Sequence, residues 1–131
     1  MDRTIVNPWT WQDQLGFVQG NDVSGATRTL YCAGQVSVDE HGAPVHAGDM
    51  AAQLVQALDN LVTVLQAAGL TLADVVRLNY YTTDVPAFLE AATPLMGRLA
   101  DARCRPASTL LGVAALFHPD ALVEIEATAA V

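Results

Sequence analysis

Two carboxylates near the C-terminal end of the chain have the spacing of a general acid–base pair. Glu124 and Glu126 alternate with apolar residues in Val123–Ala127, and alternate side chains of a strand point to the same face of its sheet. Two such carboxyl groups can divide acid and base roles when their surroundings differ. The alternative is a solvated or interface face of an edge strand. We favour this alternative for Glu126, and both interpretations stay open for Glu124.

Cys104 is a second group with chemical potential, because Arg103 and Arg105 flank it and a nearby cation lowers the pKa of a thiol. Adjacent side chains of an extended chain point apart, however, so the flanking guanidinium groups need not face the sulfur. We therefore expect no catalytic thiol. Cys104, like Cys32, is expected to be a small buried apolar residue.

Neither the cysteines nor the histidines predict a metal site. The two cysteines form no ligand cluster, and His41, His46 and His118 lack the i, i+4 spacing of two ligands on one helix. The chain also has no Gly-rich phosphate loop, Ser-His-Asp set or dinucleotide fingerprint. We therefore expect no metal and no cofactor.

The charge balance disfavours nucleic acid as a partner. The chain has 131 residues, which predicts one domain over residues 1–131, and its formal net charge is −8 with only six Lys and Arg. Binding to nucleic acid depends on basic side chains that neutralise phosphates. Six basic residues spread along the chain make a poor surface for that purpose.

The apolar composition predicts self-association. Hydrophobic residues make up 52% of the chain and charged residues 15%, which is more apolar than a soluble monomer of this size needs. No run approaches the roughly 20 apolar residues of a spanning helix, so we expect no membrane insertion but an apolar interface between copies of the chain. Trp9 and Trp11 are expected to pack on the sheet or on a neighbouring subunit. The N-terminal sequence has no signal-peptide pattern, and with the isolated cysteines this favours a cytoplasmic location.

Two stretches have the apolar periodicity of amphipathic helices. The first runs from Asp49 to Ala68, with Asp49 as its N-cap and Gly69 at the left-handed position after its end. The second runs from Asp84 to Leu99, with Asp84 as its cap. Pro94 should kink or interrupt this second helix, because proline cannot donate its backbone hydrogen bond.

The remaining segments predict strands, at Thr27 to Gln35, Val36 to Val38, Val75 to Thr83, Leu110 to Leu116 and Leu122 to Val131. In the third of these, Val76, Leu78 and Tyr80 are expected on one face. Strands and helices in this order predict one mixed sheet with both helices packed on one face. The other face is then left for contacts between subunits.

Four segments together resemble the RidA/YjgF family of reactive-intermediate deaminases. They are Tyr31–Val36 with its Gly34-Gln35 pair, Gln53–Gly69, Asp74–Asp84 and Val123–Ala127. The resemblance extends from about Phe17 to the C-terminus. It implies an α+β, chorismate-mutase-like fold: a six-stranded mixed sheet, two helices on one face and a homotrimer with clefts between subunits. It also implies hydrolysis of enamines and imines, such as 2-aminoacrylate, to a keto acid and ammonia.

The resemblance assigns site positions, and four of five lack the polar group of active members. Ser108 follows Pro-Ala, where the family has the arginine that binds the substrate carboxylate. Phe17 stands in place of a tyrosine, Ala33 in place of a serine and, with less certain spacing, Ala92 in place of an asparagine. Glu124 keeps the acid that positions the hydrolytic water. A neutral hydroxyl cannot replace the forked guanidinium contact. We therefore expect a cleft that prefers a less polar small molecule, without a carboxylate.

Arg105 leaves a second hypothesis open. It precedes Pro106, where regular strand pairing is disfavoured, so it either lies at the mouth of the cleft or serves as a surface or interface salt-bridge residue. In the first case the chain is a working imine deaminase with a relocated arginine. A third hypothesis is a non-catalytic trimer that senses a ligand or binds a partner. A ribonuclease activity also associated with the family is disfavoured by the net charge of −8.

Overall fold

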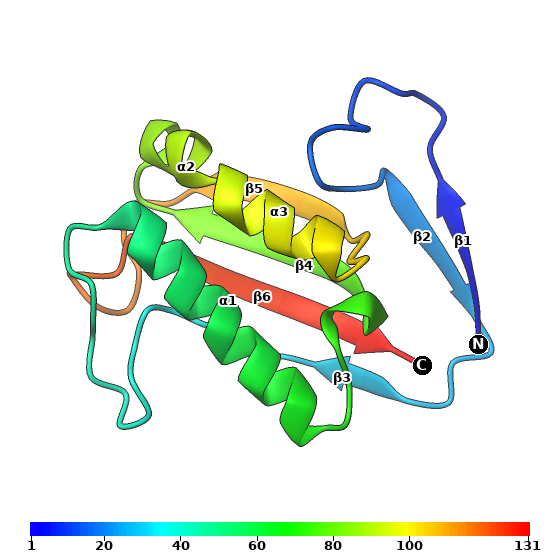
Figure 1. The fold of residues 1–131 in the computed structure, drawn as a ribbon, viewed down its shortest axis with the longest axis horizontal. Coiled ribbons are helices and arrows are strands. Elements are labelled where there is room, and N and C mark those ends of the chain that lie inside the picture. The colour runs from blue at the N-terminus through cyan, green and yellow to red at the C-terminus, as the bar shows by residue number, and fades with distance from the viewer.

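The computed structural model describes all residues, 1–131, and has a four-stranded mixed sheet at its centre. The strands are ordered β3-β6-β4-β5, with β3 at Thr29–Tyr31, β6 at Val123–Ala130, β4 at Val75–Thr82 and β5 at Ala107–Gly112. β6 is antiparallel to β3 and β4, whereas β5 is parallel to β4. The chain has three α-helices, and they cover one face of this sheet (Figure 1). The predicted α+β class is confirmed.

Helix α1, Met50–Ala67, begins and ends as its sequence predicts. The Asp49 side chain accepts a hydrogen bond from the backbone N–H of Ala52 at 3.0 Å, and Gly69 has a φ of 72°. The apolar stripe of the helix contributes its buried members to the core: Leu54, Leu58, Leu61 and Leu65 join Val75, Leu78, Val123 and Ile125 of the sheet. This stripe fixes the helix across β6.

The sequence predicts one second helix, but the structure has two in its place. The helical conformation is interrupted one residue before Thr93-Pro94. Helix α2 is Val85–Ala91, capped by the Asp84 side chain, and helix α3 is Thr93–Asp101. Pro94 lies in the first turn of α3, where its missing N–H is harmless. A single-turn 3₁₀ helix, η1 at Leu72–Asp74, precedes β4. None of the helices combines the length and apolar character needed to cross a membrane.

A two-stranded hairpin lies beside the main sheet (Figure 1) and was not predicted. It pairs β1, Asp2–Val6, with β2, Gly20–Ser24. The Arg3 guanidinium donates hydrogen bonds to the carbonyls of Ala73, Val75 and Arg105, and the Asn21 amide also donates to Arg105. The six strands therefore form two sheets, linked by these side chains and by one isolated bridge between Val18 and Ala107.

Five other details of the strands differ from their predictions. β3 covers Thr29–Tyr31 rather than Thr27 to Gln35. β6 lies inside the sheet rather than at its edge, and β5 covers Ala107–Gly112 rather than Leu110 to Leu116. Residues 36 to 38 form no strand and contribute only the bridge between Val38 and Pro44. The register of β4 shifts between Val75 and Arg77, so Val75, not Val76, shares the buried face with Leu78 and Tyr80.

Candidate functional site

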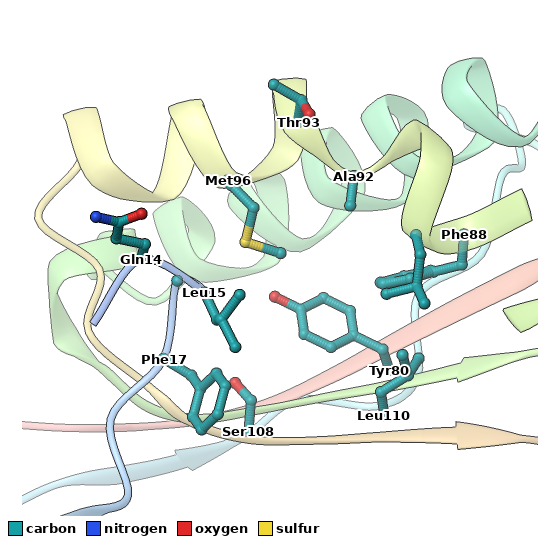
Figure 2. Close-up of a pocket in the computed structure, with 12 residues that line it drawn as sticks. Gln14, Leu15, Phe17, Tyr80, Phe88, Ala92, Thr93, Met96, Ser108 and Leu110 are labelled. Atoms are coloured by element: carbon teal, nitrogen blue, oxygen red, sulfur yellow. The ribbon is translucent and has the colours of Figure 1, made fainter. Parts of the chain in front are cut away.

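A cavity of about 570 Å³ lies between helices α2 and α3 and the β5 edge of the sheet. We call it the apolar cavity, since no charged side chain lines it. Its lining residues are Gln14, Leu15, Gly16, Phe17, Tyr80, Phe88, Leu89, Ala92, Thr93, Met96, Ser108 and Leu110 (Figure 2). Its volume falls in the range of small-molecule sites, which are mostly apolar with a few placed polar groups.

The pairing of strands β4 and β5 determines which side chains form the floor of the apolar cavity. Ser108 pairs with Leu78, and Leu110 pairs with Tyr80 on the parallel neighbour, so these side chains share the face beneath the helices. Phe88 of α2 packs on the Tyr80 ring with the centroids 5.3 Å apart. The position of the Tyr80 ring is therefore fixed by both a strand and a helix.

Two hydroxyl groups in this floor have no hydrogen-bond partner. The hydroxyl oxygens of Tyr80 and Ser108 are buried and bond neither to other protein groups nor to each other. Figure 2 shows both oxygens pointing toward the cavity. Burial raises the pKa of Tyr80 far above its ordinary value, so its hydroxyl stays protonated and can donate. Buried polar groups are nearly always paired, which makes this pair exceptional.

Three of the positions assigned by resemblance come together in the apolar cavity. Phe17 lies on the loop before β2, Ala92 lies between α2 and α3, and Ser108 lies on β5. Trp11 packs edge-on against the Phe17 ring, with the centroids 6.2 Å apart. Trp11 lies in a turn rather than on a strand, and its side chain is 64% exposed.

Arg105 lies beside the apolar cavity but not in it. It lines a second hollow of about 510 Å³ together with Asp13 and Arg103. The two hollows share Gly16, Phe17 and Met96. The Arg105 side chain makes no ion pair within the chain, so the predicted salt bridge is absent from this protomer. Phe17 and Met96 thus separate a neutral compartment from one with two arginines.

Glu124 lies on the other side of the sheet, and Ala33 directly precedes Gly34, whose backbone lies against the Glu124 carboxylate. Glu124 pairs with Tyr81 of β4, whose side chain points away from the helices, whereas Ser108 points toward them. A side chain at Gly34 would overlap the Glu124 carboxylate, so glycine allows this close approach. Within one protomer the five assigned positions therefore form two separate groups.

Glu126 shares the open face with Glu124 but is already hydrogen-bonded. It accepts hydrogen bonds from the Tyr81 hydroxyl and, at 3.2 Å, from the Asn79 amide. These donors lower the pKa of Glu126, and the same contact raises the pKa of Tyr81. The arrangement keeps Glu126 ionised and oriented, which suits a structural role better than proton transfer.

The sulfur of Cys104 is unsuited to nucleophilic chemistry. Burial raises the pKa of this thiol to about 12, although nearby Arg3 acts in the opposite direction. Burial also raises the pKa of Cys32. Across the chain, no three His, Cys, Asp or Glu side chains come close enough together to hold a metal ion.

Tyr80 is the site residue that the sequence reasoning missed. The alternation of β4 correctly places it on the same face as Leu78, and a tyrosine in a buried run is a signal that its hydroxyl needs a partner. The missing information was that β5 contributes a second hydroxyl two strand positions away. Tyr80 and the second hydroxyl are neighbours only because two segments about 30 residues apart in the sequence pair as parallel strands.

The fold and the cavity define an α+β protein with a hollow of small-molecule size at the edge of its sheet. The family model described as endoribonuclease L-PSP matches residues 15–131. The chain therefore belongs to this family, the RidA/YjgF family, as its sequence motifs predict.

Several relatives are similar over most of their length. The 2-iminobutanoate/2-iminopropanoate deaminase of Escherichia coli K12 is 32% identical over 114 residues, which cover 86% of this chain and 85% of the relative. The crystal structure of YyfB from Yersinia pestis, a Rid-family protein of unknown function, has a TM-score of 0.89 at 40% identity and covers 100% of both chains. E. coli TdcF, solved with bound serine, has a TM-score of 0.71 at 26% identity, covering 88% of this chain and 87% of TdcF.

Proposed function

We propose that this protein binds a small carbonyl or imine compound without a carboxylate, and hydrolyses or hydrates it, in clefts between the subunits of a homotrimer. The observation that supports this proposal is the apolar cavity, in which Ser108 occupies the position of the family's arginine and no lining side chain is charged. A carboxylate placed there would lose its hydration without gaining a cation, which is costly. A neutral ligand meets no such penalty.

The trimer supplies the second half of the site in this proposal. Glu124 lies on the face of the sheet opposite Ser108 and so does not reach the apolar cavity of its own protomer; we assign that role to Glu124 of a neighbouring copy. Glu124 accepts a proton from water as the water oxygen bonds to the imine carbon. Glu124 returns this proton to the nitrogen, the new hydroxyl group loses its proton to the nitrogen as the C–N bond breaks, and ammonia leaves with a carbonyl product. One water is consumed for each ammonia released.

Competing imines generated in situ test the substrate class. A flavin amine oxidase acting on benzylamine gives the neutral imine of benzaldehyde, and an amino acid oxidase acting on 2-aminobutyrate gives 2-iminobutanoate. We expect the wild type to accelerate ammonia release from the neutral imine at least about tenfold more than from 2-iminobutanoate, because the cavity lacks a cation. Ser108→Arg should reverse the order. Faster hydrolysis of 2-iminobutanoate by the wild type contradicts the proposal.

Glu124→Gln separates catalysis from binding. The variant keeps the shape of the side chain but cannot accept a proton, so turnover should fall at least about a hundredfold while the oligomer stays intact. Unchanged turnover would remove Glu124 from the mechanism. Ligand binding without turnover in the wild type would instead support a non-catalytic sensor.

A second candidate is a deaminase for carboxylate-bearing imines that uses Arg105. The observation in its favour is the second hollow, which contains Arg105 and shares Phe17 with the apolar cavity. A substrate could then place its carboxylate beyond Phe17. In that case Arg105→Ala should abolish hydrolysis of 2-iminobutanoate and leave the neutral imine unaffected.

A further inference from the structure

We infer that the hydroxyls of Tyr80 and Ser108 form a two-donor anchor for the oxygen atom of a ligand's C=O bond, and that one of them donates to the nitrogen atom of a C=N bond. The inference rests on the proposed function in taking the apolar cavity as the ligand site. It assigns a role to Tyr80, and it narrows the ligand to an apolar body with one acceptor atom.

The first line of evidence is the burial of two hydroxyls that have no hydrogen-bond partner within the chain. The Tyr80 side chain is 4% exposed, and neither hydroxyl oxygen has a partner. Leaving a buried hydroxyl unpaired destabilises the folded state. Two such groups on the floor of one cavity indicate that their partner is a molecule that enters the cavity.

The second line of evidence is geometry. Ser108 and Tyr80 come from adjacent parallel strands and share a sheet face, because Ser108 pairs with Leu78, two residues before Tyr80. Both oxygens point toward the space enclosed by Leu15, Met96 and the two helices (Figure 2). Phe88 holds the Tyr80 ring in place, so the donor is oriented before a ligand arrives.

The third line of evidence is the chemistry of the pair. Burial keeps Tyr80 in its neutral, protonated form, and serine is also neutral, so both groups donate hydrogen bonds without adding charge. One carbonyl oxygen has two lone pairs and can accept from both. Two neutral donors polarise C=O, and one of them polarises C=N through the single lone pair of its nitrogen. Both favour attack of water at the carbon, as an oxyanion hole does. They would bind a carboxylate far less well than a guanidinium group does.

Acetophenone and ethylbenzene are the probes that test this anchor, since they share a ring and a two-carbon substituent but only acetophenone has an acceptor oxygen. Full-length wild type should bind acetophenone more tightly, and the infrared stretch of the bound carbonyl should shift to lower frequency. Tyr80→Phe and Ser108→Ala should each weaken acetophenone binding by about threefold to tenfold, as expected for one hydrogen bond. Each should leave ethylbenzene binding within about twofold. The carbonyl stretch should return stepwise toward its value in solution.

Tyr31→Phe is the matched control, because it removes a hydroxyl from a tyrosine that is 79% exposed and lines neither hollow of the site. This variant should change neither the affinity for acetophenone nor the infrared stretch of the bound carbonyl. An unshifted stretch in the wild type, or equal acetophenone affinity in wild type, Tyr80→Phe and Ser108→Ala, overturns the anchor. A change of oligomeric state in these two variants, without loss of ligand affinity, would assign the hydroxyls to an interface and also overturn it.

The outcomes distinguish the anchor from the proposed function. A shifted stretch that depends on both hydroxyls supports the anchor even where no imine is hydrolysed. Hydrolysis of the neutral imine that survives in Tyr80→Phe and Ser108→Ala supports the proposed function and rejects the anchor. Binding of neither probe by the wild type rejects both.

Discussion

At the scale of single residues, the unpaired hydroxyls of the apolar cavity have a consequence for stability. In the unliganded protein, the buried Tyr80 hydroxyl is an unsatisfied group, so its removal should be favourable. We expect Tyr80→Phe to raise the free energy of unfolding by about 1 kcal/mol. Urea titration at a fixed protomer concentration measures the change, with Tyr31→Phe as the neutral reference. A loss of stability of that size would mean that the hydroxyl has a protein partner.

The open face of the sheet gives a prediction about pH. Hydrogen bonds from Tyr81 and Asn79 lower the pKa of Glu126, so the ionised form is stabilised in the folded state. This contribution to stability is present above the unfolded pKa of glutamate, and it is lost as the pH falls through the lower folded value. Tyr81→Phe removes the principal donor and should raise the pKa of Glu126.

Carbon-detected NMR titration of the Glu126 carboxyl measures this shift. The stability difference between Tyr81→Phe and wild type should be present at neutral pH and should shrink in acid, where both proteins protonate Glu126. Tyr31→Phe, on the same open face, is the control. An unchanged Glu126 titration in Tyr81→Phe would show that Asn79 alone sets the pKa.

At the scale of elements, the N-cap of α1 tests how the longest helix begins. Asp49 accepts a hydrogen bond from the Ala52 N–H at 3.0 Å, and this satisfies one of the free donors of the first turn. Asp49→Ala should reduce the free energy of unfolding by about 1 kcal/mol. Asp22→Ala removes the same charge from an exposed strand position without a cap and should change stability by less than about half as much. Equal effects from the two variants would assign the loss to charge rather than to capping.

The helices were predictable because their signals are local. Asp49 and Gly69 are cap residues at the two ends of an uninterrupted apolar stripe, and Pro94 explains the division between α2 and α3. The hairpin of β1 and β2 was not predictable in this way. Its ten residues are mostly polar or exposed, and what attaches it to the main sheet is Arg3, through carbonyls about 70 and 100 residues away. No local pattern carries that information.

The candidate site was predictable only in part, for a related reason. Family resemblance named Phe17, Ala92 and Ser108, which line one cavity; Phe17 and Ser108 have recognisable motifs around them, whereas Ala92 was assigned from less certain spacing. It also named Glu124 but could not tell that this residue faces the other side of the sheet. That distinction follows from the position of β6 between β3 and β4, which depends on pairing across the whole chain.

At the scale of the whole molecule, one protomer leaves large apolar side chains without cover. Trp9, Leu89 and Phe117 are 59%, 61% and 72% exposed, and Leu89 also lines the apolar cavity. The proposed homotrimer would cover Leu89 at the cavity, and it agrees with the high apolar content of the sequence. On this proposal, light scattering should give a mass of three times 13.8 kDa.

Mixed trimers test whether each site is built from two subunits. Ser108→Trp fills the apolar cavity but keeps Glu124, whereas Glu124→Gln keeps the cavity but loses the proton acceptor. Each variant alone should be inactive toward the neutral imine. A working site needs an intact cavity from one subunit and an intact Glu124 from its neighbour. In an equal mixture each of these is present in half of the subunits, so a co-assembled sample should recover about a quarter of the wild-type rate. Trimers of each variant, assembled separately and then combined without exchange, provide the control. Recovery in the co-assembled sample alone would establish that Glu124 acts across the interface, whereas no recovery from intact mixed trimers would mean that the two groups of residues do not form one site.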